Sequence, residues 1–131
     1  MKPLFSLFIL AAFVLTACSS TSTPSIEGQW KLVSYNGTPA APGVNTSIEF
    51  KGGQVNGNVG CNSFSGSYRV SGDTINLENL MSTLMACSDP IGAQEAATFA
   101  VLNQSATFVL AGNTLTITSA DSKSVIVLEN K

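Results

Sequence analysis

The sequence predicts an α+β fold that is mostly β, an antiparallel barrel-like domain with one helix inserted between the strands. Three observations predict it. Short segments in which polar and apolar residues alternate are separated by Gly- and Asn-containing turns through most of the chain. Two segments, 68–77 and 108–117, resemble each other, and each carries a central Gly-Asp or Gly-Asn pair typical of a hairpin turn. Only residues 90–104 have the composition of a helix.

Alternation and turn residues justify each strand in chain order. Residues 30–35 alternate and end at Asn36-Gly37, which is a turn signal. Residues 47–51 form a short strand, and Gly52-Gly53 turns the chain into the next one. The later strands are expected at 54–60, in the two halves of 68–77, in the two halves of 108–117, and, after a link at 121–124, at 125–129.

The helix is expected from Pro90 to about Gln104. Asp89 can cap it, and Pro90 suits the first helical position. The side of the helix that carries Phe99 is expected to face the core, while Glu95 lies on another face. Five aromatic residues are the core candidates, namely Trp30, Phe64, Tyr68, Phe99 and Phe108.

The N-terminus is expected to be a signal peptide, residues 1–17. Its apolar run, residues 4–15, would span about 18 Å as a helix, which is short of the ~30 Å hydrocarbon core of a bilayer. The following Leu15-Thr16-Ala17-Cys18 resembles a bacterial lipobox, which implies cleavage before Cys18 and attachment of a diacylglycerol and an N-acyl chain such as palmitate. Ser19, in place of an Asp, favours the outer membrane. An ordinary secretory signal is the alternative; a tether, 18–25, and one domain, 26–131, would follow.

The chain of 131 residues has no histidine, and this absence excludes several kinds of chemistry. Ser-His and Cys-His catalysis and histidine metal ligands are impossible. The sequence has no Gly-x-Ser-x-Gly elbow, no calcium-loop spacing and no cluster of basic residues. We therefore expect a protein that is not an enzyme, with no catalytic residue, no metal, no cofactor and no nucleic-acid partner.

Cys61 and Cys87 remain as a pair if Cys18 carries lipid. In an oxidising envelope compartment, two thiols favour a structural disulfide. It would close a loop of about 27 residues and contribute roughly 3–4 kcal/mol. A reactive thiol pair is the alternative, although no basic residue stands near either cysteine in the sequence to lower its pKa.

Four short motifs follow one another along the chain. They are Gly28-Gln29-Trp30-Lys31-Leu32, then Gly60-Cys61-Asn62 with Phe64, Gly66 and Tyr68, then Ser82-Thr83-Leu84-Met85-Ala86-Cys87, and finally Glu95 within Ala93-Gln94-Glu95. In this order they resemble the motifs of META-domain proteins, and with the lipobox they resemble lipoproteins of the heat-shock protein J type. The motif residues are Trp30, Gly60, Cys61, Asn62, Gly66, Tyr68, Ser82, Thr83, Met85, Cys87 and Glu95. Leu84 departs from the family pattern, in which Arg or another polar residue is expected.

The resemblance implies a role in tolerance of envelope stress, such as heat shock or the antibiotic novobiocin, and it carries no catalytic mechanism. Gly60 and Gly66 are expected at turns or bulges, and Asn36 and Asn62 in left-handed turn geometry. We expect a lipid-anchored monomer that binds an envelope protein. The alternatives are an inhibitor of a hydrolase that inserts an exposed loop, 36–45 or 79–88, a binder of a small apolar molecule, and a purely structural protein.

Overall fold

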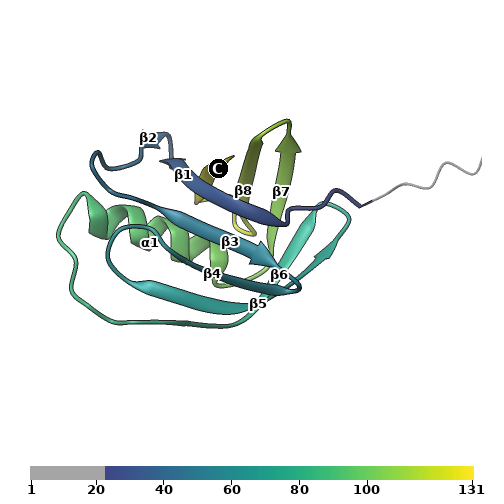
Figure 1. The fold of residues 1–131 in the computed structure, drawn as a ribbon, viewed down its shortest axis with the longest axis horizontal. Coiled ribbons are helices and arrows are strands. Elements are labelled where there is room, and N and C mark those ends of the chain that lie inside the picture. Colours follow the sequence, from purple (N-terminus) through teal and green to yellow (C-terminus); the bar gives the residue numbers. More distant parts are fainter. Residues whose placement is uncertain (1–22) are drawn as a thin grey trace, which may run out of the picture.

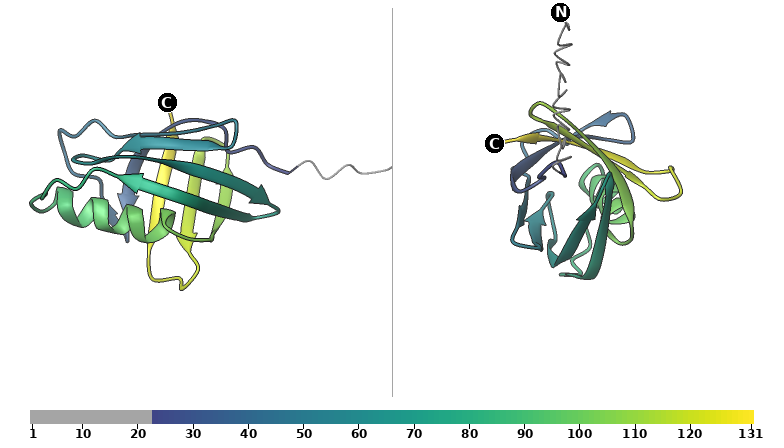
Figure 2. Two further views of the ribbon diagram at one scale, coloured as in Figure 1. Left: turned by 90° about the horizontal axis from the view of Figure 1, so that it is seen from below. Right: turned by 90° about the vertical axis from the view of Figure 1, so that its right-hand side faces the viewer.

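The computed structural model describes residues 23–131. These residues form nine strands and one helix, which are β1 (Gly28–Tyr35), β2 (Thr38–Pro39), β3 (Ser47–Lys51), β4 (Gln54–Asn58), β5 (Ser63–Ser71), β6 (Thr74–Ser82), α1 (Ile91–Leu102), β7 (Ala106–Ala111), β8 (Thr114–Ser119) and β9 (Val125–Asn130). All pairings are antiparallel, and β9 pairs back with β1, so that the sheet closes into a barrel (Figures 1 and 2). The predicted fold class is confirmed. Among the described residues, no helix is long and apolar enough to cross a membrane.

Both predicted hairpins are present, and each turns at its glycine. Ser71 pairs with Thr74 across the first turn, and Ala111 pairs with Thr114 across the second. Gly72 has φ 61° and Gly112 has φ 58°, a left-handed backbone that glycine adopts without strain. Several strand bounds differ from the prediction, and β5 begins at Ser63, before the predicted start at Tyr68. Strand β4 stops at Asn58, two residues earlier than expected, and β6 continues to Ser82, so the loop expected at 79–88 begins later.

The core fills the barrel with side chains from every long strand. Among the largest fully buried side chains are Phe50, Ile48, Ile75, Leu115 and Leu128. Trp30, Phe64, Tyr68 and Phe108 are buried, as predicted. The Trp30 indole N–H donates to the carbonyl of Ile26 at 2.9 Å, which satisfies its one polar group inside the core.

Helix α1 faces the core with a different side from the one predicted. Ala96 and Ala100 are exposed and Phe99 is half-buried, whereas the fully buried positions include Thr98, Val101 and Leu102. Phe99 lies at the edge and packs against Phe64 of β5, with ring centroids 5.6 Å apart. The prediction was wrong because it placed Phe99, the one aromatic residue of α1, inward. The helix instead buries polar side chains, whose hydrogen bonds its sequence alone does not reveal.

The start of α1 is shifted by one residue from the prediction. The helix begins at Ile91, and Pro90 occupies the N-cap position without a side-chain capping bond. Asp89 still serves the helix N-terminus, since its Oδ1 accepts a hydrogen bond from the Ala93 N–H at 3.0 Å.

The barrel has a loose seam between β6 and β7. Only Thr74 and Ile75 of β6 pair with β7, while β6 pairs with β5 along almost its whole length. Helix α1 packs against β1, β8 and β9, and in Figure 2 it runs beside the hairpin formed by β5 and β6. The chain between β6 and α1 therefore lies along the outer side of the barrel, where the third motif is found.

Tyr68 is expected to make the stability of the fold depend on pH. Burial raises the pKa of its phenol, and the negative charge of Glu27 raises this pKa further. Because the folded pKa lies above the unfolded value of about 10, the associated stability is complete below pH ~10 and is lost as the pH rises through the folded pKa. We expect the free energy of unfolding to fall above pH ~10, and to fall less in Tyr68→Phe. An equally steep fall in both proteins, measured by urea unfolding, would contradict this assignment.

Candidate functional site

Three of the four sequence motifs meet at one point of the barrel wall. Asn62 lies in the connection between β4 and β5, Glu95 lies in α1, and Thr83, Met85 and Cys87 follow the end of β6. The segment 83–88, here called the outer segment, has no helix or strand of its own. The first motif lies apart from this point, because Trp30 is a core residue of β1.

Asn62 is the centre of this cluster, and its side chain holds the outer segment. The Asn62 Oδ1 accepts hydrogen bonds from the Met85 N–H at 2.7 Å and from the Thr83 hydroxyl at 2.8 Å. The Asn62 Nδ2 donates to the Met85 carbonyl at 3.1 Å. A single buried side chain thus binds both backbone polar groups of Met85.

Glu95 holds Asn62 from the other side. Its Oε2 accepts the backbone N–H of Asn62 at 2.7 Å, and its Oε1 accepts Nδ2 of the same residue at 2.5 Å. Glu95 is only 7% exposed, so these charge-assisted bonds are the compensation for burying a carboxylate. Among the described residues, no buried side-chain nitrogen or oxygen is left without a partner.

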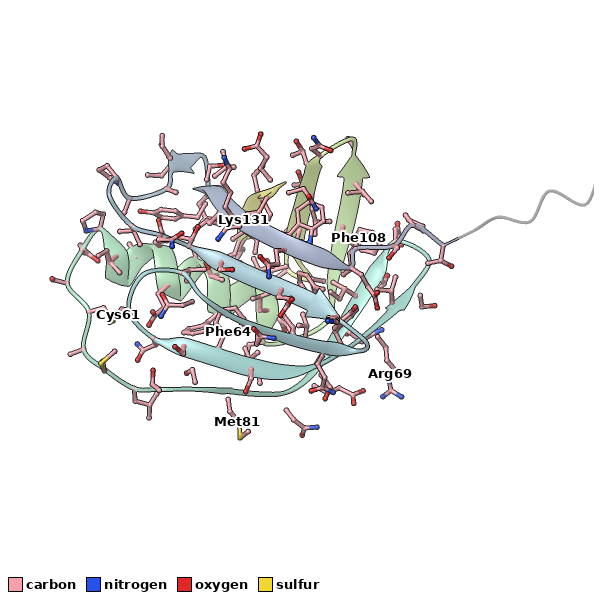
Figure 3. All side chains as sticks on the ribbon, viewed as in Figure 1. Cys61, Phe64, Arg69, Met81, Phe108 and Lys131 are labelled. Atoms are coloured by element: carbon pink, nitrogen blue, oxygen red, sulfur yellow. A yellow bond between two sulfur atoms is a disulfide. The ribbon has the colours of Figure 1, made fainter. Side chains whose placement is uncertain are left out.

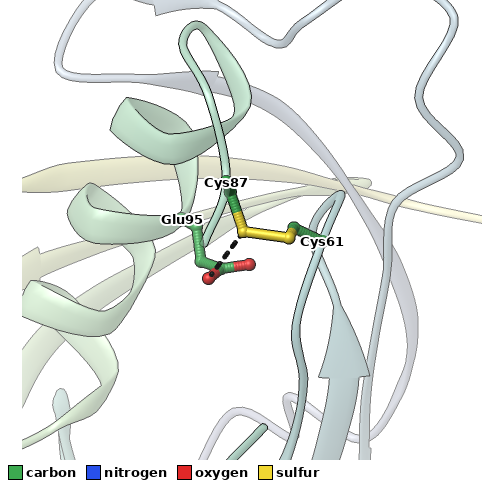
Figure 4. Close-up of side chains that lie close together, drawn as sticks. All are labelled: Cys61, Cys87 and Glu95. Carbon is green, nitrogen blue, oxygen red and sulfur yellow. Dashed lines mark hydrogen bonds between the residues drawn. A yellow bond between two sulfur atoms is a disulfide. The ribbon is translucent and has the colours of Figure 1, made fainter. Parts of the chain in front are cut away.

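The predicted disulfide between Cys61 and Cys87 is present, and it fixes the far end of the outer segment (Figure 4). The Cys87 Sγ lies 3.7 Å from Glu95 Oε1, which Figure 4 marks with a dashed line. A disulfide sulfur carries no proton, so this approach is a contact and not a donated hydrogen bond. Cys61, Cys87 and Glu95 bring their ligand atoms within 4.8 Å of one another. Metal ligation, however, needs thiolates, and both Glu95 oxygens already bind Asn62.

The motif glycines allow close packing around this cluster. Gly60 has φ 140°, and a Cβ built there would lie 2.7 Å from Ile91 Cγ2 of α1. Gly66 lies at a bulge between β5 and β6, as predicted, and its missing side chain makes room for Leu80. The expectation for Asn36 is confirmed by its φ of 47°. The expectation for Asn62 was wrong, because it is not among the residues with positive φ and acts instead through its side-chain hydrogen bonds.

The prediction missed Gln94, which ties α1 to two other parts of the chain. Its Oε1 accepts the Ala41 N–H at 2.8 Å, and its Nε2 donates to the Val59 carbonyl at 2.5 Å. Gln94 is fully buried. The only signal in the sequence was that Gln94 is adjacent to the motif residue Glu95. This adjacency does not identify the hydrogen-bond partners of Gln94.

The outer segment presents apolar side chains to solvent. Leu84 is 93% exposed and Met85 is 59% exposed. Met81, at the end of β6, is also exposed and points away from the barrel (Figure 3). Between the outer segment and α1 lies an open cavity of about 440 Å³, which is lined by Met85, Ala96 and Phe99 among others. Motif residues therefore hold, from inside, a segment whose apolar residues face outward.

The predicted lipidation site, Cys18, and the signal peptide lie outside the described residues. Of the other motif residues, Tyr68 belongs to the core, and Ser82 ends β6 in an exposed position.

Comparison with known families and structures gives one family and a shared fold. A profile of the META domain matches residues 23–131. An NMR structure matches with 25% identity and a TM-score of 0.67, covering 79% of this chain and 88% of the other. An NMR structure of a protein from Burkholderia xenovorans matches with 19% identity and a TM-score of 0.61, covering 80% and 82%. A crystal structure of a DUF4847 family protein from Bacteroides vulgatus matches with 16% identity and a TM-score of 0.58, covering 80% and 93%. A comparison with curated proteins finds no match.

Proposed function

Since this chain belongs to the META domain family, we propose that it is a non-enzymatic binding module, anchored by lipid in the bacterial outer membrane. One observation carries the proposal. The outer segment exposes Leu84 and Met85 while its backbone is bound from inside by Asn62. Exposed apolar residues on a fixed backbone are typical of a protein-binding surface.

The polar residues of the motifs support binding rather than catalysis. A catalytic acid, base or nucleophile has to reach the substrate. Asn62 and Glu95 instead point at each other, and their polar groups are occupied by bonds within the chain. Asn62 and Glu95 fix the position of the outer segment, and a binding surface needs such a fixed position.

The envelope location rests on the N-terminal sequence. The lipobox-like Leu15-Thr16-Ala17-Cys18 and the following Ser19 support lipidation and transfer to the outer membrane. The Cys61–Cys87 disulfide supports an oxidising compartment. A lipid-anchored binder fits the envelope stress tolerance, against heat shock or antibiotics, that the family resemblance implies.

Two variants separately test the lipid anchor and the choice between inner and outer membrane. Cys18→Ser is expected to move the protein from the membrane to the soluble periplasmic fraction, because the thiol that receives the diacylglycerol is gone. Ser19→Asp is expected to keep it membrane-bound but shift it to the inner-membrane fraction. Fractionation followed by immunoblotting measures both. Membrane-bound Cys18→Ser protein would contradict the lipid anchor.

Crosslinking in intact cells tests the binding function. The full lipidated chain is expected to form a crosslinked species with an envelope protein, and Leu84→Asp is expected to abolish it because a charge replaces the most exposed apolar side chain. Val109→Asp is the matched control, since Val109 is 65% exposed on β7, outside the outer segment. The binding proposal fails if wild type and Leu84→Asp give the same crosslinked species, or if neither gives one.

A further inference from the structure

The outer segment is fixed on both sides of a single exposed residue. Its most exposed residue, Leu84, stands between two fixed points of the backbone. On one side, the Thr83 N–H donates to the Ser63 carbonyl at 3.0 Å, and the Ser63 N–H donates to the Thr83 hydroxyl at 3.1 Å. On the other side, Asn62 binds both backbone groups of Met85, and the disulfide follows at Cys87.

We propose that the outer segment is the reactive loop of an inhibitor of serine endopeptidases whose specificity pocket is apolar. This inference rests on the proposed binding function and names its partner. The loop enters the active-site cleft as a substrate would, with Leu84 in the specificity pocket and the Leu84–Met85 peptide bond facing the catalytic serine.

The chemistry of the exposed residues selects this class of enzyme. Endopeptidases of the chymotrypsin type read mainly the residue before the scissile bond, which enters a single pocket. Leu84 is 93% exposed, so a pocket can enclose it almost completely, and its apolar side chain matches an apolar pocket. Thr83 and Ala86, which flank Leu84 and Met85, have small side chains.

The fixed backbone explains why such a segment would inhibit. A flexible peptide loses conformational entropy when it enters a cleft, whereas a segment held in advance loses little and binds more tightly. The bonds of Thr83 and Met85, on either side of Leu84, leave its side chain free while restraining the backbone around it.

The same contacts would slow hydrolysis of the bound loop. Cleavage breaks the bond between the Leu84 carbonyl carbon and the Met85 nitrogen, and one water supplies the hydroxyl to the carbon and a proton to the nitrogen. After cleavage, the two halves of the chain remain joined through Cys61 and Cys87. Asn62, on the first half, still binds Met85, so the new amine stays beside the acyl carbon and re-formation of the bond competes with release.

Inhibition assays with a change of specificity test the proposal. The full lipidated chain in detergent is titrated against chymotrypsin, subtilisin and trypsin, each with a peptide substrate. We expect the wild type to inhibit chymotrypsin or subtilisin. Leu84→Arg is expected to weaken this inhibition by about 30-fold or more, the effect of losing a hot-spot residue, and to create inhibition of trypsin, whose pocket carries a negative charge. Val109→Arg, the matched control, is expected to behave as wild type.

A second readout identifies the bond. After long incubation with the inhibited enzyme, the chain is expected to gain the mass of one water. It is expected to separate into two fragments, one ending at residue 84 and one beginning at residue 85, only after reduction of the disulfide. Rapid cleavage at other bonds, or the absence of inhibition by both wild type and Leu84→Arg, overturns the proposal. If inhibition fails but the Leu84-dependent crosslinked species persists in cells, the binding function stands and only this inference falls.

Discussion

Asn62→Ala is expected to destabilise the domain by about 3 kcal/mol, the cost of leaving several buried hydrogen-bonding groups, one of them a carboxylate, without a partner. The substitution removes the amide that binds Glu95, Thr83 and Met85. It leaves the buried Glu95 carboxylate with only the Asn62 backbone N–H. Urea unfolding at neutral pH measures the change. A loss below about 1 kcal/mol, the value of one ordinary hydrogen bond, would contradict the central role of Asn62.

A double-mutant cycle separates the Asn62–Glu95 contact from the rest of the cluster. Asn62→Asp places a carboxylate oxygen against Glu95 Oε1, so like charges meet and stability falls. Glu95→Gln alone removes the negative charge but places a second side-chain amide against the amide of Asn62. The double variant restores a donor–acceptor pair with the roles exchanged, and we expect it to be more stable than Asn62→Asp. Additive effects of the two substitutions would mean that the two side chains are not coupled.

Removal of the disulfide is the second large effect expected. The double variant Cys61→Ala/Cys87→Ala is expected to lose about 3–4 kcal/mol, because the cross-link no longer restricts a closed loop of this length in the unfolded chain. For a domain of this size the melting temperature should fall by roughly 15 °C. Calorimetry measures it, and reduced wild type is the matched control, expected to melt close to the double variant. An unchanged melting temperature would contradict a stabilising role.

The hairpins of this fold could be predicted because their signals are local. A turn that begins with glycine, flanked by alternating residues, determines the pairing of its own two strands, and both pairings follow. The closure of β9 onto β1 joins segments almost a hundred residues apart, and no local pattern specifies this register. The barrel was therefore predicted as a class and not as a set of pairings.

The helix shows where local reasoning failed. Phe99 was expected to face the core because it is large and apolar. The structure buries Gln94, Glu95 and Thr98 instead, because each finds hydrogen-bond partners. Thr98 bonds within the helix, but the partners of Gln94 and Glu95 are distant in the sequence, and amphipathic spacing cannot detect them.

The residues of the candidate site could be predicted from the sequence, but their arrangement in space could not. The cysteine pair followed from chemistry and compartment, and the motifs followed from the family resemblance. That Asn62 would bind Met85, and that Glu95 would bind Asn62, required the connection between β4 and β5 to lie beside the segment after β6. The pairing of β5 with β6, the Cys61–Cys87 disulfide and the placement of α1 bring these parts together.

Amide hydrogen exchange at Met85 tests the central claim most directly, that buried motif residues hold an exposed segment in place. Met85 is 59% exposed, yet its N–H donates to Asn62 Oδ1 at 2.7 Å. The account predicts slow exchange at Met85, faster exchange at the Leu84 amide, which has no partner among the described residues, and loss of the Met85 protection in Asn62→Ala. Exchange at Met85 as fast as in an unstructured peptide would show that the segment is not held, and the account would be wrong.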